Sequence, residues 1–72
     1  MVGRIKKSAL QPGDRLEKVG SMGSVWIVDH IVETSTQLPH AVIAYEKDPE
    51  ETRLLAVSVL LDDSRYRLVL PH

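Results

Sequence analysis

The chain contains no cysteine, and this absence removes two of the ways in which a small domain is stabilised. Disulfide bonds and thiolate metal sites are both excluded, because each requires cysteine side chains. No apolar segment of the kind found in signal peptides follows the first basic residues, and no segment approaches the ~20 apolar residues of a membrane span. These absences together predict a cytoplasmic protein without a membrane partner, and the sequence indicates no cofactor.

Length sets a second limit, because 72 residues form at most one domain. A chain of this size buries only about 60% of its unfolded surface, so its stability is marginal unless a partner chain adds to its core. We expect a flexible N-terminal lead-in over residues 1–10 and a single small β-barrel domain over residues 11–72. The size of the domain favours self-association.

Aromatic side chains are scarce, since Trp26, Tyr45 and Tyr66 are the only ones. Recognition of methylated side chains needs a cage of several aromatic residues. A cage built from all three would leave the core without an aromatic residue, which argues against this role.

Net charge is also small, at −1 near neutral pH. Arg4, Lys6 and Lys7 give the first thirteen residues a charge of +3, which leaves residues 14–72 at −4. Non-specific affinity for nucleic acid comes from neutralised phosphates, so an acidic body of this kind is a poor general nucleic-acid binder.

What the sequence does contain is a series of short β-branched segments separated by turn residues. Asp29 and His30 interrupt the second of them, and a β-bulge there would put Trp26, Val28 and Ile31 on one face. The predicted strands cover residues 15–19, 24–33, 40–46, 52–61 and 66–70, with turns over residues 11–14 and 47–51.

A helix competes with the fourth strand. Asp48 is a possible N-cap with Pro49 at the first helical position, but Val57 and Val59 alternate and no polar face follows, so we predict a strand over residues 52–61. That strand is apolar on both faces, whereas a half-exposed strand alternates apolar and polar residues. Either loops cover it as a central strand, or one face packs against a second copy.

Three features of the sequence resemble SH3-like small barrels. They are the "PGD" before the first strand, the "W-x-V-x-x-I" that begins at Trp26 and the "L-L-D-x-S-x-Y-R-L-V" that begins at Leu60. The resemblance implies an all-β barrel of about five antiparallel strands, with a short helical turn over residues 60–64. The glycine loop is also similar to KOW-type modules of ribosomal and transcription proteins, and the opening is similar to small uncharacterised bacterial proteins. These resemblances imply a fold and not one activity.

Catalytic patterns are missing. The histidines lack zinc-binding spacing, and the serines show no nucleophile motif. We therefore expect a non-enzymatic binding module that contacts a protein partner or forms a homodimer. Its candidate partner-binding residues are Trp26, Tyr45, Leu54, Ala56 and Ser58.

A nucleic-acid-associated barrel is the alternative. In that alternative, Gly20 and Gly23 would let a ligand approach the backbone, but the role we expect for both glycines is a hairpin turn between the first two strands. The candidate phosphate contacts are Lys6, Lys7, Lys18, Arg65 and Arg67.

Overall fold

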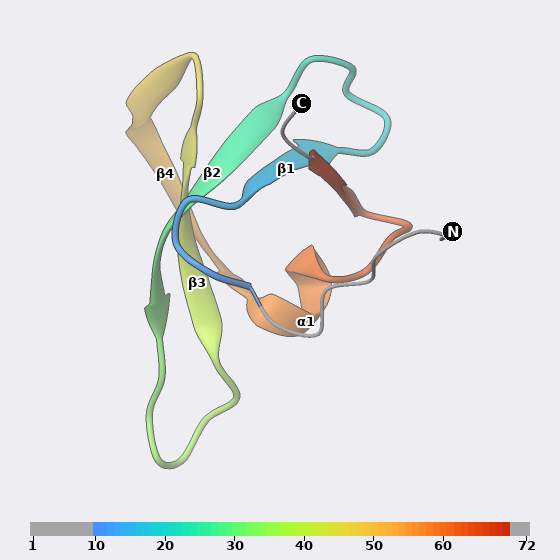
Figure 1. The fold of residues 1–72 in the computed structure, drawn as a ribbon. Helices are drawn as coiled ribbons and strands as arrows, with labels where there is room; N and C mark the ends of the chain where they lie inside the picture. The colour runs from blue at the N-terminus through green and yellow to red at the C-terminus, as the bar shows by residue number, and fades with distance from the viewer. Residues whose placement is uncertain (1–9, 70–72) are drawn as a thin grey trace, which may run out of the picture.

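Five β-strands form one antiparallel sheet in the structure, a computed structural model that describes residues 10–69 (Figure 1). The order in the sheet is β4-β3-β2-β1-β5, and a short helix, α1, connects β4 to β5. The elements are β1 (Arg15–Lys18), β2 (Val25–Val32), β3 (His40–Tyr45), β4 (Asp48–Ala56), α1 (Val57–Leu60) and β5 (Tyr66–Val69).

This arrangement confirms the predicted all-β class, the five antiparallel strands and the short helical turn before the last strand. The sheet is not closed into a barrel, since β4 and β5 are its two edges and do not pair with each other among residues 10–69. The described part of the chain has no helix with the length and hydrophobicity to cross a membrane.

The predicted β-bulge in β2 is present. The pairing of β2 with β3 shifts between Val28 and His30, so Asp29 is the extra residue. Trp26 and Val28 are buried and Ile31 packs against the same core, as the bulge requires. The turn before β1 joins this region, because Gly13 N–H donates to Val28 O at 2.8 Å.

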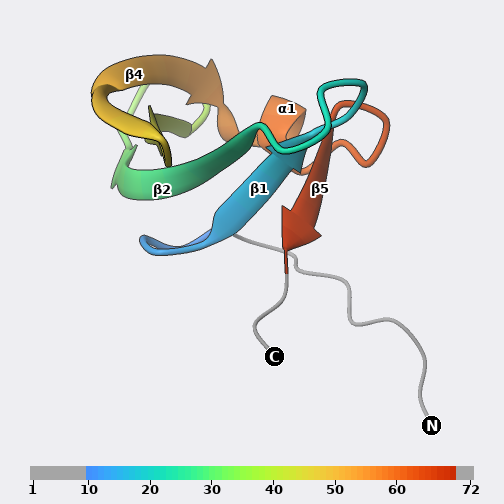
Figure 2. The same ribbon diagram turned by 90° about the horizontal axis from the view of Figure 1, so that it is seen from above.

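The core occupies one face of the sheet. Figures 1 and 2 show that the sheet curves and that α1 lies on its concave side, between the end of β4 and β5. Leu10 belongs to this core, while the rest of the predicted lead-in lies outside the described residues. The buried residues are Leu10, Leu16, Trp26, Val28, Ala41, Ile43, Leu60 and Tyr66.

The prediction of a continuous strand over residues 52–61 was wrong in its second half. Strand β4 ends at Ala56 and α1 begins at Val57, because β3 begins at His40, opposite Ala56, and offers no partner strand beyond it. In an extended chain, Leu60 would share the face of Leu54 and Ala56. The helical turn rotates Leu60 into the core instead, where it is 1% exposed.

Two turns also differ from the expectations. The turn after β3 is shorter than the predicted 47–51, since β4 already begins at Asp48. The helical turn before β5 spans Val57–Leu60 and not residues 60–64.

Leu60 is the contribution of α1 to the core, so Leu60→Ala should lower the free energy of unfolding by about 3 kcal/mol. Ser58→Ala, an exposed site on the same helix, should change it by less than about 0.5 kcal/mol. Urea denaturation followed by Trp26 fluorescence measures both. Equal stability of the two variants would show that α1 does not complete the core.

Asp62 shapes the turn that leads from α1 into β5. The Ser64 hydroxyl donates to Asp62 Oδ1 at 2.7 Å, and Ser64 N–H donates to the same oxygen at 2.9 Å. These hydrogen bonds, together with the nearby charge of Arg65, lower the pKa of Asp62 below its ordinary value of 3.8. Because the folded state binds this proton more weakly, the stabilisation is present above about pH 3.8 and is lost as the pH falls through the folded pKa.

We therefore expect Asp62→Asn to lower the thermal unfolding midpoint near neutral pH. The difference from the parent chain should shrink at acid pH, where Asp62 is protonated. Asp63→Asn is the matched control, since it removes the same charge without the bonds to Ser64. A pH-independent difference for Asp62→Asn would contradict this account.

Candidate interaction surfaces

The face of the sheet opposite the core carries mostly apolar residues across β2, β3 and β4. Residues directly opposite each other in an antiparallel pair share a face, so the registers define three rows: Ile27–Ala44–Thr52, His30–Val42–Leu54 and Val32–His40–Ala56. Leu54 is 60% exposed and Val32 is 37% exposed. We call this surface the outer patch, and it consists of Ile27, Val32, Val42, Ala44, Leu54 and Ala56.

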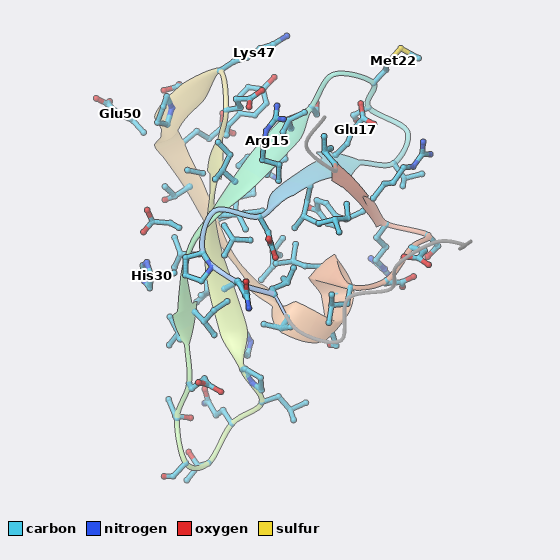
Figure 3. The ribbon with its side chains drawn as sticks, in the orientation of Figure 1. Arg15, Glu17, Met22, His30, Lys47 and Glu50 are labelled. Atoms are coloured by element: carbon cyan, nitrogen blue, oxygen red, sulfur yellow. The ribbon has the colours of Figure 1, made fainter. Side chains whose placement is uncertain are left out.

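Two histidines lie among these apolar residues. Figure 3 shows His30 projecting away from the sheet on the side opposite α1. Its Nδ1 lies 2.6 Å from Asp29 Oδ2, and His40 Nδ1 lies 2.8 Å from Leu38 O. Among the described residues, no group of three or more histidine or acidic side chains is arranged to hold a metal ion.

The predicted partner-binding residues are divided between the two faces. Trp26 is 5% exposed and lies in the core, with the Tyr45 ring centroid 5.1 Å from its own. The Arg53 guanidinium stacks on the Trp26 ring at 4.9 Å, which covers it further. Leu54 and Ala56 lie on the outer patch, and sequence reasoning identified them through the apolar run.

Ser58 does not share a face with Leu54 and Ala56. It lies on α1, where it is exposed. The apolar run did not reveal this, because the alternation of Val57 and Val59 and the lack of a polar face favour a strand. The start of β3 at His40 was predicted correctly, but its consequence was missed: β4 has no strand to pair with beyond Ala56.

A cleft of about 280 Å³ lies beside the loop that joins β1 to β2. Lys18 and Arg67 line it together with Gly20 and Glu17, and Met22 projects from the tip of the loop (Figure 3). Neither cation forms an ion pair with another described residue. Arg67 lies directly opposite Glu17, whereas Lys18 lies opposite the buried Tyr66, so the two cations line the cleft from opposite faces of the sheet.

The other predicted phosphate contacts are elsewhere. Arg65 Nε lies 3.5 Å from Asp62 Oδ2, which makes it part of an ion pair outside the cleft. Lys6 and Lys7 lie outside the described residues. The structure therefore brings together two of the five predicted cations.

The loop that contains Gly20 and Gly23 forms a hairpin turn between β1 and β2, which is the role that the sequence predicted for both glycines. Gly20 and Gly23 have φ angles of 88° and 83°, a region that other residues rarely adopt. Lys18 N–H donates to Ser24 O at 2.9 Å, which continues the pairing of β1 and β2 into the loop. Gly23 N–H donates to Glu17 Oε2 at 3.1 Å and is not free for a ligand.

No family model, curated protein or solved structure matches this chain.

Proposed function

We propose that this chain is a small non-enzymatic interaction module that associates with a second copy of itself through the part of the sheet around Leu54. The observation that carries the proposal is the outer patch. Leu54 is 60% exposed at the edge of a face that also presents Val32, Val42 and Ile27. Contiguous apolar surface on a small protein marks a site of protein contact or a risk of aggregation.

The small size of the domain supports a copy of the same chain as the partner. Eight apolar residues are buried in the described part of the chain, and no disulfide adds to their stabilisation. A partner that binds only the folded state raises stability in proportion to the logarithm of its concentration. The resemblance to SH3-like barrels and the expected cytoplasmic location belong to the same proposal.

Leu54→Lys is the direct test, because two copies meeting around Leu54 would bring like charges together. Sedimentation velocity should show a dimer for the parent chain at high protein concentration and a monomer for Leu54→Lys. Leu38→Lys is the matched control, since Leu38 is 75% exposed but lies in the loop between β2 and β3. A parent chain that remains monomeric up to its solubility limit would contradict the proposal.

Binding of a nucleic acid through the cleft is the second candidate. It is favoured by one observation, the placement of Lys18 and Arg67 on the same cleft without ion-pair partners among the described residues. Glu17 lines the cleft as well, and the net charge of −1 adds no attraction at long range.

A salt titration against single-stranded RNA tests this candidate. Affinity should rise steeply as salt falls, and Lys18→Ala with Arg67→Ala should lower the salt slope by roughly one per lost phosphate contact. Arg65→Ala is the control, because Arg65 pairs with Asp62 outside the cleft. No binding at low salt would end the nucleic-acid hypothesis.

A further inference from the structure

The free edge of β4 has two unlike halves. Pairing with β3 runs from His40–Ala56 to Ala44–Thr52 without interruption and then shifts to Tyr45–Asp48. The half before Thr52 therefore bulges, and it carries Pro49, Glu50 and Glu51. Proline, charge and irregularity are the features that keep an edge strand from pairing with another chain. The half over residues 52–56 is regular and lacks proline, so it is open to pairing.

The hydrogen bonds of the neighbouring residues show which backbone N–H and C=O groups of this regular half point to the free edge. Val57 N–H donates to Pro39 O at 3.1 Å, so Val57 faces β3. Successive residues of an extended strand point their N–H and C=O groups to opposite sides. Thr52, Leu54 and Ala56 therefore point theirs to the free edge, where no other described strand pairs with β4.

The pairing on the other side of β3 gives the same result. Glu46 N–H donates to Val25 O at 2.9 Å, so Glu46 faces β2 and alternation turns Ala44 and Val42 the same way. Ala41 and Ile43 then face β4, opposite Leu55 and Arg53.

We propose that residues 52–56 of β4 pair antiparallel with the same segment of a second copy, about a two-fold axis at Leu54. This inference rests on the proposed self-association and specifies its geometry. Thr52 lies opposite the partner's Ala56 and Leu54 lies opposite the partner's Leu54. Three residue pairs then exchange two backbone hydrogen bonds each. The two outer patches become one continuous surface.

The side chains favour this axis over axes at Arg53 and at Thr52. An axis at Arg53 would put two arginines directly opposite each other, which is destabilising. An axis at Thr52 would extend the pairing into the irregular half, opposite Leu55 and Ala56 of the partner. It would also pair Arg53 with the partner's Glu51, but Arg53 already lies 3.4 Å from its own Glu51 and covers Trp26. An axis at Leu54 places Arg53 opposite the partner's Leu55, so no like charges face each other.

Ala56→Pro tests the hydrogen bonds of the edge without disturbing the fold. Ala56 has φ −62°, which proline adopts without strain, and its N–H does not face β3. The variant should keep the unfolding free energy of the monomer and raise the dimer dissociation constant by roughly tenfold or more, since two interchain hydrogen bonds are lost by symmetry. Ala56→Ser is the control that keeps the N–H. An unchanged dissociation constant for Ala56→Pro would overturn the edge pairing.

Single-cysteine variants test the register, and the chain has no native cysteine to interfere. Leu54→Cys should form a disulfide-linked dimer under mild oxidation, because the two Leu54 Cα atoms would lie about 5.5 Å apart. Thr52→Cys should not, since the two Thr52 positions would be separated by roughly 14 Å along the strands.

The outcomes separate the two proposals. Cross-linking of Thr52→Cys in preference to Leu54→Cys would place the axis at Thr52 and overturn the register. A parent chain that dimerises, with neither variant cross-linking, would overturn edge pairing while leaving self-association intact. A monomeric parent chain would overturn the proposed function and this geometry together.

Discussion

The extra residue in β2 determines which side chains in the second half of that strand are buried. Without Asp29 as a bulge, strict alternation from Trp26 and Val28 would bury His30 and expose Ile31. The bulge reverses this, so Ile31 packs against the core and His30 lies on the outer face. The turn before β1 depends on the same place, since Gly13 N–H donates to Val28 O and Val28 N–H donates to Asp14 O.

This constraint could be predicted from the sequence because it is local. Two adjacent polar residues inside a β-branched run leave few ways to keep the apolar residues on one face. The hairpin glycines were predictable for a similar reason, as positive φ angles and flanking strands involve neighbouring residues only. The end of β4 was missed although the start of β3 at His40 was predicted correctly, because the end depends on the register between the two strands, which places Ala56 opposite His40.

The residues of the candidate surfaces show the same difference between features set by neighbouring residues and features set by contacts between strands. Leu54 and Ala56 were identified from an apolar run whose two faces could not both be covered, and they do lie on the outer patch. Trp26 was a candidate partner-binding residue, and residue type alone could not show that it lies in the core. Its burial follows from tertiary contacts with Tyr45 and Arg53, which come from other strands. That Lys18 and Arg67 both line one cleft likewise depends on the neighbouring positions of β1 and β5 in the sheet.

A single curved sheet can bury only one of its faces, and a chain this short has few residues left to cover the other. Here α1 covers the inner face with Leu60. Among residues 10–69, no element covers the outer patch or pairs with the free edge of β4. Pro49 and Glu50 hinder pairing with another chain along the irregular half of the β4 edge, whereas the regular half beside Leu54 is open to pairing. An edge of this kind resists pairing with other chains along its irregular half, and it leaves the regular half able to pair with a second copy in one register. A second chain paired at this edge would satisfy the open backbone groups of β4 and would join the two outer patches into one surface across the dimer.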